Sequence, residues 1–300
     1  MIDGLSVLCF AGTYGLALVS DLARFAVRSA SRGWMTLGLM ALAWTVQTVY
    51  LANRAHESGT LPLTTPFESL LVLSWLLGAI GLYLVARAPK AAVGVFVLPV
   101  VVGLLAAAGA LSNRAAWLDT RGAASFWGTV HGLLLLAGEL CSCVAFVTGL
   151  MYLIQSRRLK HKRPASRFLP LPSLEQSERV NRAAITLAFP LLTAGLFTGV
   201  ALVILLRGKS AVQIGWGDPK VISTIAAWLA SGVLLHARFR PEMRGRRVMI
   251  LTLLSFAFMV FTLIGMDLFR LPTAHGRKTA ANPPAKSLAG ESEAHGGSTS

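Results

Sequence analysis

Hydrophobic residues form eight long stretches along the 300-residue chain, with short polar segments between them. A transmembrane helix needs about 17 to 25 mainly apolar residues to cross roughly 30 Å of hydrocarbon, and each stretch is long enough. The pattern therefore predicts an all-α, polytopic membrane helix bundle of about eight transmembrane helices. The expected spans are 4–23, 34–53, 67–86, 92–111, 125–154, 183–206, 221–239 and 248–268.

The first and fifth stretches depart from the simplest pattern. The first begins almost at Met1, but it lacks the basic start and small-residue cleavage site of a signal peptide, so we expect a retained helix. The fifth is longer than a bilayer requires and should protrude on one side. The segment after Phe269 is rich in Gly, Ser, Ala and Pro, a composition that predicts disorder.

Composition agrees with a membrane protein and predicts its orientation. Hydrophobic residues make up 54% of the chain and charged residues 14%, which is too apolar for an ordinary soluble domain. The net charge of +15 could indicate nucleic acid, but 18 of the 28 Lys and Arg residues, counting Arg238 at the end of the seventh stretch, belong to the loops after the odd-numbered stretches. Basic residues collect in cytoplasmic loops. We therefore expect contact with membrane lipid, no nucleic-acid partner, and both termini outside the cytoplasm.

The three cysteines, Cys9, Cys141 and Cys143, all fall within expected helices, and no CxxC pair occurs. Thiol-disulfide exchange by this chain is therefore not expected. The "CSC" spacing points the two thiols about 200° apart on a helix, which argues against a shared metal. We interpret these residues as small apolar packing groups.

Two of the six histidines share one expected membrane surface. His131 follows Trp127 by one helical turn, so the two side chains share a face. His275 follows the outer end of the last stretch. Two imidazoles at one surface could ligate the iron of haem from opposite sides. On spacing alone, however, the favoured alternative is that each histidine lies at the membrane interface with its ring nitrogens in contact with water.

The other histidines and the membrane carboxylates have simpler accounts. His56, His161 and His295 are expected at the surface, in a basic loop and in the tail. His236 lies some 22 Å along its helix, near the cytoplasmic boundary, where it is either a boundary residue or a ligand inside the bundle. Glu139 could serve hydrogen bonding, proton transfer or helix packing. Glu68 opens a helix, where an acid suits the helix dipole.

Four segments of the sequence resemble the cytochrome c assembly family of haem-handling membrane proteins, especially its CcsA/ResC-type and HemX-like members. They are "PLTTPFESLLVLSW", "WGTVHGLLLLAGELCSCVAFVTGLMYLIQSRRLK", "LPSLEQSERVNR" and "LAFPLLTAGLFTGVALVILLRGKSAVQIGWGDPKVISTIAAWLASGVLLHARFRPEMRGRRVMILTLLSFAFMVFTLIGMDLF". The resemblance implies a haem-handling domain over 60–276, preceded by two helices and an outer loop in 1–59 and followed by a tail in 277–300.

The resemblance also implies roles for individual residues. His131 and His275 match the two external haem-ligating histidines, and His236 matches the histidine within the membrane. The segment Gly215 to Lys220 matches the family's tryptophan-rich loop, an aromatic platform for haem that would include Trp216 and Asp218. Trp127, on the face of His131, is a further expected contact. The implied metal is the haem iron, and the bound substrate is haem b.

The loop departs from the family's pattern. Family members usually have a second tryptophan before Asp-Pro-Lys-Glu, whereas this chain reads "GWGDPKV", with Trp216 alone and Val221 in place of the glutamate. The stacking area for a macrocycle is therefore smaller, and each missing aromatic contact could cost about a kcal/mol.

The family's activity implies partners and a location. Haem would be held for attachment to apocytochrome c in a bacterial cytoplasmic (inner) membrane, beside a ResB/CcsB-like membrane protein, with the chain as one subunit of a haem lyase or synthase complex. A HemX-like regulatory or scaffolding role in haem synthesis is the alternative. A small-solute transporter using Glu139 is a third reading, but the chain shows no inverted repeat or broken helices.

Overall fold

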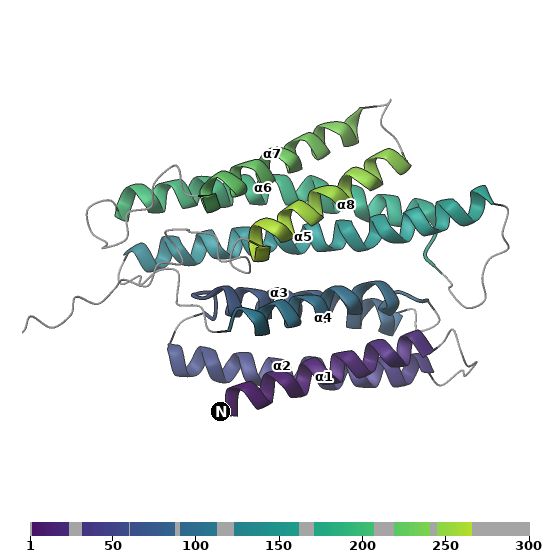
Figure 1. Cartoon of the computed structure of the whole chain (residues 1–300), viewed down its shortest axis with the longest axis horizontal. Helices are drawn as coiled ribbons and strands as arrows, with labels where there is room; N and C mark the ends of the chain where they lie inside the picture. The colour runs from purple at the N-terminus through teal and green to yellow at the C-terminus, as the bar shows by residue number, and fades with distance from the viewer. Residues whose placement is uncertain are drawn as a thin grey trace, which may run out of the picture.

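The computed structural model describes residues 2–23, 32–59, 61–87, 91–112, 123–161, 171–206, 219–240 and 245–265. Within these ranges the chain is helical and contains no strand, which confirms the all-α prediction (Figure 1). The helices are α1 (Ile2–Leu22), α2 (Arg32–Ser58), α3 (Pro66–Arg87), α4 (Gly94–Ala110), α5 (Ala123–Lys160), α6 (Leu174–Leu206), α7 (Pro219–Phe239) and α8 (Arg246–Val260), the last continued by a π-helical turn, Phe261–Gly265.

Length and hydropathy allow most of these helices to cross a membrane. Among the described residues, six helices meet both criteria, and α1 and α4 contribute shorter apolar helices. The helices run alternately in opposite directions (Figure 1). We call the end of the bundle where α1, α3, α5 and α7 begin the His131 end, and the opposite end the His236 end.

Two helices extend well past their expected apolar spans at the His236 end. α5 has 38 residues, or about 57 Å at 1.5 Å per residue, and α6 begins at Leu174 rather than near 183. Ser173 precedes α6, and its hydroxyl accepts a hydrogen bond from the Gln176 N–H at 3.1 Å. Capping of this kind starts a helix regardless of membrane thickness. The expected protrusion of the fifth stretch is therefore found, and α6 shares it.

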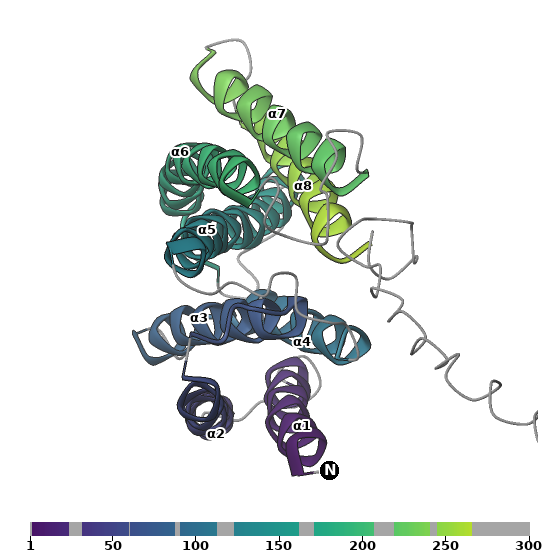
Figure 2. The ribbon, with the colours of Figure 1, turned by 90° about the vertical axis from the view of Figure 1, so that its left-hand side faces the viewer.

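The eight helices form two groups of four. In the first group α1 packs on α2 and α4, and α3 packs on the same two helices. In the second group α5 packs on α6 and α8, and α7 on the same two. Figure 2 shows the groups stacked, with α3 and α4 facing α5. Cys143 of α5 is 1% exposed within the shared core, as expected for a packing residue, whereas Cys9 is exposed.

An aromatic clamp joins the second and third helices of the first group. The rings of Trp44 in α2 and Trp75 in α3 stack with centroids 5.6 Å apart and planes 11° apart. The Trp75 indole N–H donates to the hydroxyl of Thr48 at 2.8 Å. Thr48 lies one helical turn after Trp44, so a single face of α2 supplies both contacts.

The second group repeats this clamp between α6 and α7. Phe189 stacks on Trp228 with centroids 5.7 Å apart and planes 23° apart, and the Trp228 indole N–H donates to Thr193, one turn after Phe189, at 2.9 Å. The two groups therefore share helix order and direction as well as this contact.

Replacing Thr193 with valine should lower the unfolding free energy by about 1 to 3 kcal/mol, because it removes the acceptor of a half-buried indole N–H. The measurement is reversible unfolding in mixed detergent. Thr45→Val is the matched control, since its exposed hydroxyl donates to the Ala41 carbonyl of its own helix. Equal effects of the two variants would contradict the role given to the clamp.

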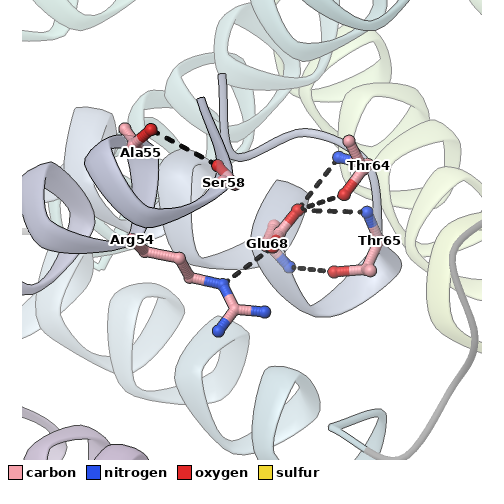
Figure 3. Close-up of polar contacts among 6 residues, drawn as sticks. All are labelled: Arg54, Ala55, Ser58, Thr64, Thr65 and Glu68. Atoms are coloured by element: carbon pink, nitrogen blue, oxygen red, sulfur yellow. Dashed lines mark hydrogen bonds and ion pairs between the residues drawn. The ribbon is translucent and has the colours of Figure 1, made fainter. Parts of the chain in front are cut away.

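The start of α3 is fixed by a capping box with an added ion pair (Figure 3). The Glu68 N–H donates to the Thr65 hydroxyl at 3.1 Å, and the Glu68 carboxylate accepts from the N–H groups of Thr64 and Thr65. Arg54 of α2 donates to the same carboxylate at 2.7 Å. Glu68 therefore joins α2 to α3, beyond the dipole interaction expected from the sequence. This arrangement holds the 61–65 segment, where Leu63 packs beside Gly132 of α5.

Candidate functional site

The structure places the described candidate residues at opposite ends of the second helix group. Trp127 and His131 lie in the first turns of α5, at the His131 end, and His236 lies in the last turns of α7. Trp216, Asp218 and His275 lie outside the described residues. The expected approach of His131 to His275, and the platform formed by Trp216 and Asp218, therefore remain predictions.

Glycines bring α5 and α6 close together along the seam that carries His131. A Cβ atom on Gly138 of α5 would lie 2.7 Å from Leu192, and one on Gly195 of α6 would lie 2.6 Å from Leu135. Each helix thus packs a leucine over a glycine of the other. At the other end of the seam the Asn181 amide donates to the Ala145 carbonyl at 2.8 Å. Small residues permit this close helix approach within a membrane.

The imidazole of His131 lies in this seam, against the backbone of α6. A Cβ atom on Gly199 would lie 2.7 Å from His131 Cε1, so the ring occupies the space that any larger residue would fill. His131 Nδ1 lies 2.7 Å from the Gly195 carbonyl oxygen. The Thr198 hydroxyl lies 3.5 Å from the same nitrogen. The side chain is half-buried, and α6 holds one edge of its ring.

Two aromatic side chains lie beyond His131 at the end of α5. Trp127 is 39% exposed, and Phe126 is 65% exposed. Their rings meet edge to face with centroids 5.8 Å apart. Sequence reasoning singled out Trp127 but missed Phe126, although the adjacent "FW" pair was a visible signal. Together they present an apolar aromatic surface one turn from the histidine.

His236 has a different setting, on the outer surface of α7. The residue is exposed, and its Nε2 accepts a hydrogen bond from Arg240 Nε at 3.0 Å. In this single chain His236 therefore lies on the outer surface of the helix group, and its expected role as an inner ligand remains a prediction.

Arg238, two residues further, is buried instead. Its side chain is 2% exposed, and its guanidinium donates to the Glu178 carboxylate at 3.2 Å and to the Glu178 backbone carbonyl at 3.1 Å. The sequence analysis counted Arg238 among the loop cations. That assignment is wrong, because α7 turns this residue toward α6, where Glu178 neutralises it.

The remaining acidic candidate, Glu139, is partly buried on α5, one turn before Cys143. Among the described residues, no group of three or more His, Cys, Asp or Glu side chains lies close enough to hold a metal ion.

Comparison with known proteins decides the family. The sequence pattern of the family described as "Cytochrome C assembly protein" matches residues 63–271. The chain belongs to this family. The match includes His131, Trp216, Asp218 and His236, and it ends four residues before His275. The cytochrome c assembly fold and a role in cytochrome c biogenesis thus agree with the multi-pass helical structure.

Two protein names recur among the relatives of this chain. The cytochrome c biogenesis protein CcsA of Synechococcus sp. (strain CC9605) is 27% identical over 284 residues, covering 86% of this chain and 92% of that protein. CcsA of Guillardia theta is 25% identical, covering 77% and 81%. Protein HemX of Bacillus subtilis (strain 168) is 23% identical, covering 78% and 83%. Both groups expected from the resemblance are therefore present.

Proposed function

We propose that this cytochrome c assembly protein holds haem b at the outer face of a bacterial inner membrane, between His131 and His275, for attachment to apocytochrome c. The observation that carries the proposal is the setting of His131. Its Nδ1 is engaged by a backbone carbonyl of α6, its ring is half-buried near the start of α5, and an exposed aromatic pair lies one turn away.

The chemistry asked of this chain is binding and orientation. Thioether attachment joins the cysteine thiols of the acceptor's CxxCH segment to the vinyl groups of haem, so the acceptor supplies the nucleophiles. This chain would supply imidazole ligands and an apolar surface for the macrocycle, with Trp127 and the loop residues Trp216 and Asp218 beside it. Apolar aromatic surfaces with a few directed polar groups suit a flat, largely apolar ligand.

His236 supports a second element of the proposal, a ResB/CcsB-like membrane partner. The outer face of α7 presents Ile222, Leu229 and Val233, each more than half exposed, in line with the exposed His236. We propose that a transmembrane helix of the partner covers this stripe and brings a second histidine opposite His236. An ionisable group at membrane depth commonly has such a functional partner.

A HemX-like regulatory or scaffolding role is the second candidate function. The "GWGDPKV" segment, which has one tryptophan fewer than the family's pattern, and the HemX relatives favour this role. In that case the His131 setting would persist without stable haem binding.

The deciding experiment is the visible absorption spectrum of the detergent-purified chain, oxidised and reduced, produced with adequate haem and a ResB-like partner. We expect a sharp reduced α-band in the parent and its loss in the His131→Ala/His275→Ala double variant. The matched control is His56→Ala/His161→Ala, which removes two histidines from an exposed helix end and a basic turn. Absence of the band from the parent would replace the haem-holding proposal with the regulatory one.

A further inference from the structure

We propose that Gly195, Thr198 and Gly199 of α6 are positioning residues for His131: they fix its imidazole as the tautomer protonated at Nδ1 and leave Nε2 as the ligand atom. The tautomer and orientation concern the chain alone. The role of Nε2 as an iron ligand rests on the proposed function.

The tautomer follows from the partner of Nδ1. A backbone carbonyl oxygen can only accept a hydrogen bond. Its separation of 2.7 Å from His131 Nδ1 is that of a short hydrogen bond, so Nδ1 carries the proton. In the neutral ring the other nitrogen, Nε2, then has the free lone pair that a metal requires.

Thr198 reinforces this choice through its own hydrogen bonds. Its hydroxyl donates within α6, to the carbonyls of Ala194 at 2.9 Å and Gly195 at 2.8 Å. With its proton engaged there, the hydroxyl oxygen lies 3.5 Å from His131 Nδ1 as a second acceptor. Nδ1 therefore faces two oxygens, and both favour the protonated nitrogen.

Gly199 fixes the plane and depth of the ring. A Cβ atom at this position would lie 2.7 Å from Cε1, 3.1 Å from Nδ1 and 3.6 Å from Nε2 of His131. The three nearest atoms are Cε1 and the two ring nitrogens, so the Nδ1–Cε1–Nε2 edge of the ring faces α6, and the glycine leaves the space beside Nε2, the most distant of the three, unfilled. An alanine would push the imidazole away from α6 and lengthen the bond to Gly195.

Such a partner has a defined effect on a ligating histidine. A carbonyl that accepts from the second ring nitrogen orients the imidazole and raises the basicity of the ligating nitrogen. Loss of an outer partner of this kind usually lowers metal affinity about 10- to 100-fold. We call Gly195, Thr198 and Gly199 the α6 cradle, and we expect this cradle to strengthen binding of haem through His131.

The first test uses the full chain without haem. ¹⁵N-histidine NMR in detergent, with His131 assigned by the His131→Gln variant, should show a neutral ring protonated at Nδ1. Gly199→Ala should shift His131 toward a mixture of tautomers. Gly78→Ala is the matched control, because its Cβ atom also meets a side-chain atom at 2.7 Å, but that atom belongs to Tyr14 in the first helix group. A ring protonated at Nε2 in the parent, or an unchanged His131 signal in Gly199→Ala, would overturn the proposal.

A milder pair of variants covers the case in which Gly199→Ala does not fold. Thr198→Val removes the second acceptor and should lower the fraction of His131 protonated at Nδ1 in the ¹⁵N spectrum. Thr198→Ser keeps the hydroxyl and should show the parent's fraction. A merely structural role for Thr198 predicts no difference in the His131 signal between these two variants, and that result would remove Thr198 from the cradle.

The second test adds haem and separates the two proposals. We expect haem to dissociate about 10 to 100 times faster from Gly199→Ala than from Gly78→Ala. If the Nδ1-protonated tautomer is found but no variant binds haem, the cradle stands and the haem-holding function fails. If haem binds equally well to both variants, the function stands and the role of Gly199 in ligation is overturned.

Discussion

Glu178→Ala should lower the unfolding free energy by about 3 kcal/mol, one of the two largest effects that we expect in this protein. The reason is the asymmetry of the ion pair: the Arg238 side chain is 2% exposed, whereas that of Glu178 is 34% exposed. Removal of Glu178 leaves a guanidinium buried at the contact between α6 and α7 without its counter-ion, which costs more than loss of the carboxylate's own contacts. Unfolding titrations in mixed detergent measure the difference.

Glu175→Ala is the matched control for this prediction. Glu175 lies one turn earlier on α6 and pairs with Arg179, but both side chains are at least 80% exposed, so its removal should change stability by less than about 1 kcal/mol. The double variant Glu178→Ala/Arg238→Met should recover most of the loss, because no buried charge then remains. A double variant as unstable as Glu178→Ala would contradict a buried-charge mechanism.

His131→Gly should weaken haem binding by more than about 100-fold, the second of the two largest effects. Loss of even an outer-shell partner costs about 10- to 100-fold, and this change removes the proposed ligand itself. Loss of the ring leaves a gap beside Gly199, so free imidazole should enter the gap and partly restore the haem spectrum. Haem titration with and without imidazole measures both effects.

His236→Gly provides the comparison for this variant. His236 lies at the opposite end of the second helix group, exposed and bonded to Arg240. We expect His236→Gly to retain haem at the His131 end in the detergent-purified chain. Haem binding that survives in His131→Gly without imidazole, yet is lost in His236→Gly, would move the principal site to the other end of the molecule.

Hydropathy was sufficient to predict the eight helices, because a membrane imposes one length and one polarity on every span. It did not predict where α6 begins. The segment 174–182 is too polar to read as a span, yet Ser173 caps it and Glu175 pairs with Arg179 on the helix surface. The start of α6 is therefore set by local capping and a surface ion pair, which a hydropathy pattern does not reveal.

The site was only partly predictable for a similar reason. His131 stood out by its position near a membrane surface, but its cradle lies 64 to 68 residues further along the chain. Only the register between α5 and α6 brings the two together. The burial of Arg238 likewise depends on the rotation of α7 against α6, and a count of basic residues carries no information about that rotation.

The two helix groups, each with its own aromatic clamp, separate the candidate site from the other half of the molecule. Within each helix group every helix packs on two others of the same group. The α5–α6 seam with His131, its α6 cradle and the Arg238 ion pair all lie within the second group. The first helix group contacts the second through one side of α5 and through Leu63 beside Gly132. The first helix group thus supports the second by packing, and we expect substitutions on its outward-facing sides to leave the contact of His131 with α6 unchanged.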